Sequence, residues 1–117
     1  MKFEAEIAEL VQACPGARGA ALMDSDGIPV VTHPQSSTLE AVAAEFATVI
    51  REVDRSGREF QHGRLQQLLV RTEVAAVIFT EVARDCFLLV LLDADGSAGK
   101  ARFLSRLVAG RLHADFS

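Results

Sequence analysis

The segment Cys86–Leu92 is an unbroken apolar run, Cys-Phe-Leu-Leu-Val-Leu-Leu, and it constrains the fold more than any other part of the chain. A half-exposed strand alternates polar and apolar residues, because successive side chains point to opposite faces of the sheet. This run shows no such alternation, so both of its faces should be covered. It is also far too short to cross a membrane. We therefore expect a buried strand in a sheet that has helices on both faces.

Four further apolar segments are expected to be strands: Gly19–Met23, Ile28–His33, Leu65–Thr72 and Val74–Val82. The segment between the first two, Asp24-Ser25-Asp26-Gly27, is a tight-turn signature, because Asp bonds to its own backbone and Gly accepts a positive φ. Pro29 lacks the N–H that a full ladder of hydrogen bonds requires. The strand that contains Pro29 is therefore expected at an edge of the sheet.

Helices are expected at both ends of the chain. The first is predicted from apolar residues at helical spacing: Phe3, Ile7, Leu10 and Val11. It should stop at Cys14, because Pro15 disfavours helix in the residue before it. The last helix is predicted over Ala98–His113. Its inner stripe is expected to consist of Ala101, Leu104, Leu107, Val108 and Leu112,.

A long amphipathic helix is predicted over Ser37–Ser56. Ser37 or Thr38 can cap it, and with Ser37 as the cap Glu40 would complete a capping box. Gly57 is expected to end it. The stripe facing the core is predicted to be Leu39, Val42, Ala43, Phe46, Val49, Ile50 and Val53,.

Two features of the predicted fold are suited to contact with a second copy of the chain. The long helix carries a second ridge, small at one end and basic at the other: Ala41, Ala44, Thr48, Arg51 and Arg55. The small residues would let another helix approach closely, and an antiparallel partner would bring Glu40 and Glu45 near Arg51 and Arg55 of the other copy. The segment Gln66–Val70 would form an edge strand without Pro or Lys to block pairing.

The predicted order of elements is α-β-β-α-β-β-β-α within a single domain that covers residues 1–117. This order fits an α+β fold with a five-stranded antiparallel sheet. The long helix is expected on one face of that sheet, and the two terminal helices on the other.

Composition and charge narrow the classes of function. The net charge of −4 argues against a nucleic-acid partner, which favours a basic domain. The chain has no Trp or Tyr, so a partner surface must rely on Phe, aliphatic residues and Arg. The start of the chain does not resemble a signal peptide. Cys14 and Cys86 are expected to be free thiols, and the expected location is cytoplasmic, with no membrane partner.

The segments that resemble metal-binding or phosphate-binding sites are better explained by structural roles. The Asp24–Gly27 segment resembles the start of a calcium loop, but Gln35 stands where such a loop needs Glu. Gly96–Lys100 resembles part of a phosphate loop, but Ala101 follows the Lys in place of the required hydroxyl residue. The scattered His33, His62 and His113 lack the spacing of a metal site. We expect no catalytic, cofactor-binding or metal-binding residues, and no enzyme.

The polar stretch Ser56–Gly63 is expected to be an exposed loop. Phe60 stands alone among its polar neighbours there, which makes it a candidate contact for a partner. Plain solvation of the loop is the interpretation that we favour over such a contact.

Several motifs together resemble the Roadblock/light-chain-7 family over nearly the whole chain. Pro15–Val30 is similar to the opening signature of the family, which has a Pro-Gly, a Gly-Ala strand, an Asp-x-Asp-Gly turn and an apolar return. The Ala-rich Leu39–Val53 helix, Val70–Glu73 and Leu88–Leu92 also match. Each motif alone is weak, but their order and spacing are fairly specific.

The resemblance implies a homodimer in which the long helices lie antiparallel and the third strands pair. The interface would contain Ala41, Ala44, Thr48, Arg51, Arg55, Gln66, Leu68 and Val70. Among bacterial members the chain looks most like the MglB type, which binds and stimulates a small Ras-like GTPase. Candidate partner-binding residues are Glu45, Glu52, Arg58 and Phe60.

A protein can stimulate a GTPase in two ways, and the resemblance does not imply the first of them, an arginine finger. Arg51, Arg55, Arg58 or Arg64 would serve as an arginine finger, or the helix-pair surface would order the switch loops of the GTPase. We favour ordering of the switch loops. The alternatives to a GTPase regulator are a scaffold or adaptor subunit without effect on GTP turnover and, ranked last, a small-molecule sensor.

Overall fold

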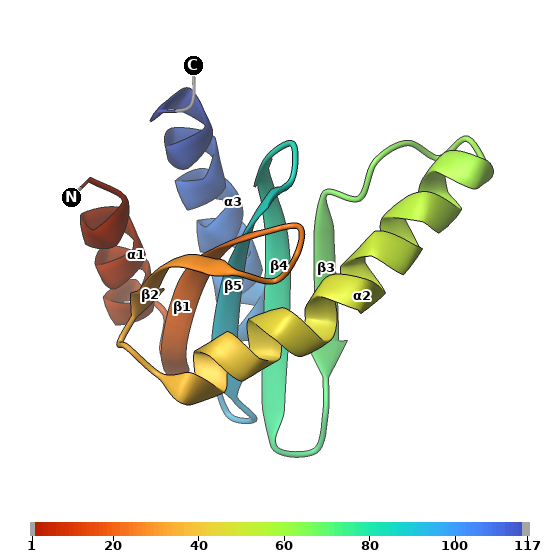
Figure 1. Ribbon diagram of the computed structural model, residues 1–117. Coiled ribbons are helices and arrows are strands. Elements are labelled where there is room, and N and C mark those ends of the chain that lie inside the picture. The colour runs from red at the N-terminus through yellow and green to blue at the C-terminus, as the bar shows by residue number, and fades with distance from the viewer. Residues whose placement is uncertain (1, 116–117) are drawn as a thin grey trace.

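The computed structural model describes residues 2–115, and its elements follow the predicted order (Figure 1). The helices and strands are α1 (Lys2–Ala13), β1 (Ala17–Asp24), β2 (Pro29–His33), α2 (Ser37–Glu59), β3 (Gln67–Arg71), β4 (Ala75–Ala83), β5 (Cys86–Asp93) and α3 (Ala98–Asp115). The α+β class and the α-β-β-α-β-β-β-α order are confirmed.

The five strands form one antiparallel sheet in the order β2-β1-β5-β4-β3. β5 occupies the centre, and Phe87–Leu92 are buried without interruption, as the apolar run predicts. β2, which contains Pro29, lies at one edge, and β3 lies at the other. Both edge positions agree with the sequence.

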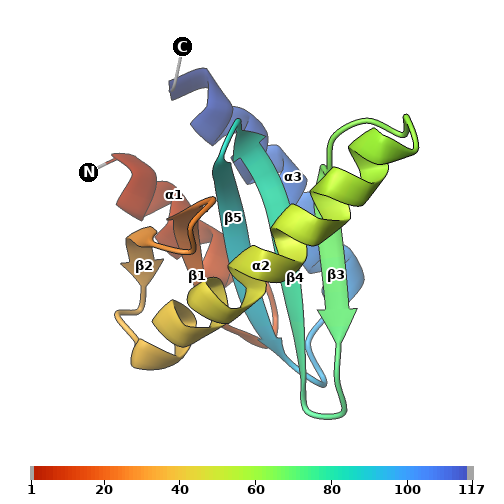
Figure 2. The same cartoon turned by 45° about the vertical axis from the view of Figure 1, so that its right-hand side comes forward.

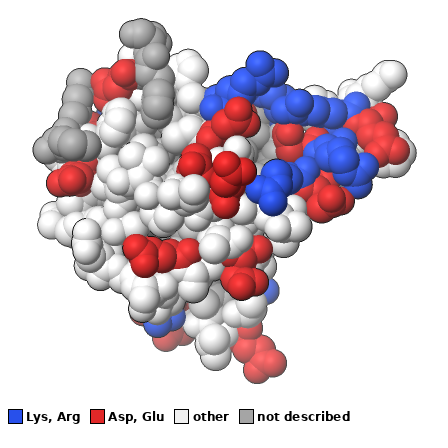
Figure 3. Space-filling view, in the orientation of Figure 1, with Lys and Arg blue, Asp and Glu red and all other residues white. Residues whose placement is uncertain are grey.

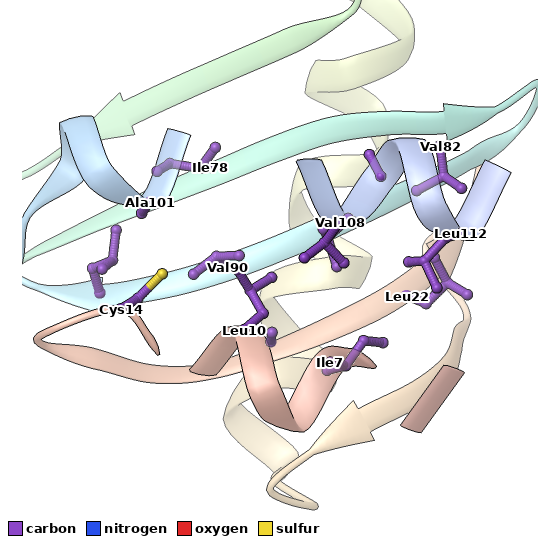
Figure 4. Packing of buried hydrophobic residues seen from close by; sticks show 14 of the residues in the cluster. Ile7, Leu10, Cys14, Leu22, Ile78, Val82, Val90, Ala101, Val108 and Leu112 are labelled. Atoms are coloured by element: carbon purple, nitrogen blue, oxygen red, sulfur yellow. The ribbon is translucent and has the colours of Figure 1, made fainter. Parts of the chain in front are cut away.

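Helices cover the two faces of the sheet as expected, with α2 crossing one face and α1 and α3 on the other (Figure 2). Each face has its own core. Figure 4 shows the core under α1 and α3, where Leu10 of α1 and Val108 of α3 point onto the sheet near Val90. On the other face, Leu39, Ala43, Ala47 and Ile50 of α2 pack onto the sheet.

The helix α2 begins at Ser37 as predicted, but the predicted cap, Ser37 or Thr38, is wrong. Ser36 is the cap, and its hydroxyl oxygen accepts hydrogen bonds from the backbone N–H groups of Thr38 at 3.1 Å and Leu39 at 3.3 Å. The capping box does not form, because the residue three positions after Ser36 is Leu39 rather than Glu40.

The predicted end of α2 is also wrong. The helix runs through Gly57 to Glu59, so the exposed loop begins at Phe60 rather than at Ser56. Gly57 does not end the helix. Its lack of a side chain allows the following loop to approach closely, because a Cβ there would lie 2.7 Å from the carbonyl oxygen of Gly63. The loop thus folds back over the helix, and the His62 N–H donates to the Gly57 carbonyl at 2.7 Å.

Parts of the predicted inner stripes are exposed. Val49 and Val53 of α2 are 41% and 37% exposed, whereas Ala47 is buried. In α3 the predicted inner residue Leu107 is exposed, and Ser105 and Ala109 are buried in its place. In each helix, the strip of surface that contacts the sheet is narrower than the apolar face of the helix.

The third strand is shorter than predicted and begins at Gln67 rather than Leu65. The N–H of Leu65 donates instead to the Asp54 carboxylate of α2 at 2.7 Å. The segment that leads into β3 is therefore attached to the helix before the strand begins.

Candidate protein-interaction surfaces

The outer edge of β3 has no backbone partner among residues 2–115. Leu68 packs partly against the core under α2, and Val70, two residues on, points to the same face of the sheet. The predicted interface residue Gln66 lies just before the strand, where its carbonyl accepts from the Glu81 N–H at 2.8 Å. The structure thus brings Gln66, Leu68 and Val70 together on an open strand edge.

One flank of α2 lies against the turn between β1 and β2. Arg51 donates from Nη1 to the carbonyl oxygen of Ser25 at 2.6 Å. A Cβ on Gly27 would lie 2.8 Å from the Ala43 carbonyl oxygen and 2.9 Å from the Ala44 Cα, so only Gly fits there. We call this flank the hairpin side of α2. It carries the predicted ridge of Ala41, Ala44, Thr48, Arg51 and Arg55.

The opposite flank of α2 carries apolar residues with heptad-like spacing, Val42, Phe46, Val49 and Val53, which we call the outer apolar side. The Phe46 ring lies 5.3 Å from that of Phe79 in β4, centroid to centroid. Val42 and Phe46 share their cluster with Leu68 of β3. Val49 and Val53 remain open, so this side extends the apolar surface next to the β3 edge.

The structure therefore separates the residues predicted to form one dimer interface. The strand residues adjoin the outer apolar side, whereas the helix ridge lies on the hairpin side. The helical periodicity predicts Val49 and Val53 as core residues, so their exposure is not expected from the sequence. The alternating spacing of four and three residues, typical of a helix–helix seam, was the signal that could have identified them.

The partner-binding candidates lie along the exposed part of α2. Glu45, Glu52 and Arg58 are exposed, and Phe60 is 66% exposed at the C-cap. Phe60 follows Val53 by seven residues, two helical turns, and so continues the line of the outer apolar side.

Charged side chains gather over the C-terminal half of α2 and the neighbouring loop, shown in the upper right of Figure 3. Arg55 pairs with Glu52 at 2.9 Å and Glu59 at 2.8 Å, and Arg58 pairs with Asp54 at 2.9 Å. The hydrogen bond to Glu52 raises the pKa of Arg55 above its ordinary value. Arg64 pairs with Glu81 at 3.0 Å. Each of the four candidate finger arginines thus already has a partner within the chain.

The segments that resemble ligand loops have structural roles. The Asp24 carboxylate accepts from the N–H groups of Asp26 at 2.9 Å and Ile28 at 3.0 Å, which holds the turn. Ser97 accepts from the Lys100 N–H at 3.2 Å and so caps the start of α3. Among the described residues no three His, Cys, Asp or Glu side chains come together to hold a metal ion.

The two cysteines are poor nucleophiles in their surroundings. Burial raises the pKa of Cys14, although the charge of Lys100 opposes this. Burial, with a smaller contribution from Asp24, raises the pKa of Cys86 to about 11. Both thiols therefore stay protonated at neutral pH. Within residues 2–115, no helix combines the length and apolar character needed to span a bilayer.

Comparison with known proteins agrees with the fold described above. The family model of the Roadblock/LC7 domain matches residues 4–92. A Roadblock/LC7 domain from Streptomyces avermitilis has 17% identity and a TM-score of 0.87, covering 97% of this chain and 96% of its own. MglB of Myxococcus xanthus has 17% identity and a TM-score of 0.87, over 99% and 95% of the two chains. MglC of Myxococcus xanthus has 27% identity and a TM-score of 0.70, over 98% and 99%. No curated protein sequence matches the chain at a significant level.

Proposed function

Because this chain belongs to the Roadblock/LC7 domain family, we propose that it acts as a homodimeric regulator of a small Ras-like GTPase through protein–protein contact. The likeness to MglB of Myxococcus xanthus and of Thermus thermophilus supports this proposal at the level of the fold. The observation that carries it is the open β3 edge beside the exposed outer apolar side of α2.

In the proposed dimer, the β3 strands of two copies pair antiparallel and join the two sheets into one. An unpaired edge presents free N–H and C=O groups, and pairing with a second copy satisfies them. The two α2 helices then lie side by side through their outer apolar sides. That arrangement would bury the exposed apolar side chains of Val49, Val53 and Phe60 away from water, which favours association.

The hairpin side of α2 stays open in this dimer. Ala41, Ala44 and Thr48 are exposed there, beside the exposed Ile28 and Val30 of the β1–β2 hairpin. We propose this surface, with Glu45 and Glu52, as the contact for the GTPase. Ala44 thus moves from the predicted dimer interface to the proposed partner surface.

Ordering of the switch loops accounts better than an arginine finger for any stimulation of GTP hydrolysis. A finger must reach the transferred phosphoryl group with a free guanidinium. Arg51 is bonded to Ser25, and Arg55, Arg58 and Arg64 are each bonded to a carboxylate of the same chain. A rigid helix surface, in contrast, can favour one switch-loop conformation by contact alone.

The test is single-turnover hydrolysis of GTP by the Ras-like GTPase of the same organism, with and without this protein. Acceleration that follows the dimer concentration is expected. Co-elution with the GTP-bound form without acceleration would indicate a scaffold or adaptor instead. If the protein neither bound the GTPase nor accelerated hydrolysis, the proposal would be contradicted.

A further inference from the structure

A groove of about 900 Å³ lies on the face of the sheet opposite α2. Its floor is the end of β4 at Thr80, Glu81 and Val82, and its walls are the C-terminal half of α3 and the segment His62–Gln67. Figure 2 shows the end of β4 between α3 and the start of β3. Apart from Gln66, a predicted interface residue, and Arg64, one of the candidate fingers, the groove contains none of the residues named above for the dimer or the GTPase.

The walls of the groove are held in place by side-chain hydrogen bonds. Gln67 donates from Nε2 to the Thr80 hydroxyl at 3.0 Å and to the Arg102 carbonyl at 3.1 Å, which joins β3 to β4 and α3. Arg64 pairs with Glu81 at 3.0 Å and so fixes the loop wall to the floor. The groove is thus formed before any ligand binds.

Cationic and donor groups dominate the lining. Arg64, Arg106, His62 and His113 line the groove together with a single carboxylate, Glu81, and that carboxylate is already paired with Arg64. Arg106 makes no ion pair with any residue between 2 and 115. This local excess of positive charge contrasts with the net charge of −4 of the whole chain.

His113 is oriented so that one ring nitrogen remains available. Its Nδ1 lies 2.8 Å from the Val82 carbonyl oxygen. A carbonyl oxygen only accepts, so Nδ1 carries the proton and donates it. Nε2 is then the acceptor nitrogen of the ring, and no residue between 2 and 115 occupies it,.

The shape of the groove suits a polypeptide segment better than a small molecule. It is open to solvent, whereas small-molecule sites enclose most of the ligand surface. A Cβ on Gly63 or on Gly110 would meet nothing within 4 Å, so both positions leave room for a passing backbone. Leu65, Val82 and Ala109 supply apolar lining for aliphatic carbons.

We propose that this groove binds an acidic, extended segment of a partner protein, whose carboxylates bond to the guanidinium of Arg106. Guanidinium groups bind carboxylates through paired N–H donors, which gives geometric specificity as well as affinity. This proposal does not depend on the GTPase, because the groove and the proposed GTPase contact lie on different faces of the molecule.

Two pairs of variants test the groove. Arg106→Glu reverses the unpaired charge, and its control, Lys100→Glu, makes the same change in charge on α3 outside the groove. Gly110→Phe fills the groove, and its control, Gly99→Phe, adds the same ring to α3 where a Cβ also meets nothing within 4 Å. Circular dichroism of each variant confirms that it is folded.

The probe is a blocked peptide of about twelve residues that repeats Glu-Leu-Asp-Ala, about 40 Å long when extended. It is titrated into the ¹⁵N-labelled full chain, and amide shifts are followed. We expect shifts concentrated in residues 62–67, 80–82 and 106–113. Arg106→Glu and Gly110→Phe should each weaken binding by about tenfold or more, with both controls within about twofold of the parent chain.

Four results would overturn the proposal. The first is no binding of the peptide at millimolar concentration, or shifts centred elsewhere. The second is equal loss in Arg106→Glu and Lys100→Glu, which would indicate attraction to the overall charge. The third is equally tight binding of free glutamate or inorganic phosphate, which would indicate a small-anion site. The fourth is a change of oligomeric state in the groove variants, which would indicate a contact between copies of this chain.

Discussion

Arg51 donates a hydrogen bond of 2.6 Å to the carbonyl oxygen of Ser25, and this bond ties the middle of α2 to the turn between β1 and β2. The turn can come this close because Gly27, with a φ of +82°, has no Cβ to strike the helix. The hairpin side of α2 is thereby attached to the turn at Arg51, while Ala41, Ala44 and Thr48 on the same side stay exposed. On the opposite flank Val49 and Val53 are exposed as well.

The first prediction separates the two flanks of α2. Val49→Arg should convert the dimer into a monomer at micromolar concentration, because an unpaired charge would be buried between the two helices. Ala44→Arg should leave the protein dimeric, since Ala44 lies on the hairpin side. Light scattering during size-exclusion chromatography gives the mass directly. A monomeric Ala44→Arg beside a dimeric Val49→Arg would place the interface on the hairpin side.

The second prediction concerns the candidate arginine fingers. Alanine at Arg51, Arg55, Arg58 or Arg64 should lower any stimulation of GTP hydrolysis by no more than about tenfold, because each guanidinium is already bonded within the chain. Loss of a true finger costs roughly a thousandfold or more. Single-turnover rates of the four variants measure this. A thousandfold loss from any one of them would rule out the switch-loop account.

The third prediction concerns two glycines within helices. Gly57→Ala should lower the free energy of unfolding by about 1–3 kcal/mol, because the new Cβ would lie 2.7 Å from the Gly63 carbonyl oxygen,. Gly110→Ala should raise it by about 0.5–1 kcal/mol, because Ala favours the helix and nothing crowds the site. Urea unfolding of both variants supplies the values. If Gly57→Ala were stabilising as well, the close approach of the loop would be refuted.

The fourth prediction is a loss of stability in alkali. The pKa of Cys86 rises from 9.0 to about 11 on folding, so the folded state holds this proton more tightly than the unfolded state. The contribution to stability is therefore complete below pH 9 and lost as the pH rises from about 9 to 11. Allowing for the partial exposure of Cys86, the loss should be about 1–2 kcal/mol.

The control for the alkaline loss is Cys86→Ala, which should show a shallower decline over the same pH range. The chain has no Tyr, so no phenol titrates in this range. Urea unfolding at pH 8 and pH 10.5 compares the two proteins. Parallel declines would mean that Cys86 is not the group responsible.

Much of the fold follows from local patterns in the sequence. The apolar run Phe87–Leu92 has no polar alternation, which predicts that both faces of β5 are covered, and Pro29 predicts that β2 lies at an edge. Each of these features depends only on the burial or the hydrogen bonding of its own segment, so the local sequence is enough to predict it. The end of α2 was predicted wrongly because Gly57 does not end the helix. It allows the close approach of Gly63, and the sequence pattern does not show this contact with the loop.

The candidate surfaces were harder to predict than the fold. The apolar stripe of α2 is wider than its contact with the sheet. The four-and-three spacing of its apolar residues indicates a helix–helix seam, but it does not show how much of the stripe the sheet covers. The structure shows this only through the crossing of α2 over the sheet and the position of the β1–β2 turn. The groove beside α3 was missed for the same reason, since Arg106, His113 and Glu81 come together only in the folded chain.

The most direct test of the central claim is single-turnover GTP hydrolysis with the Ras-like GTPase, measured at equal concentrations of the parent chain, Val49→Arg and Ala44→Arg. The account predicts acceleration by the parent chain, little by the monomeric Val49→Arg, and little by the dimeric Ala44→Arg, whose partner surface is blocked. Full acceleration by a monomeric Val49→Arg would contradict a dimeric regulator. No acceleration and no binding by the parent chain would contradict a GTPase partner altogether.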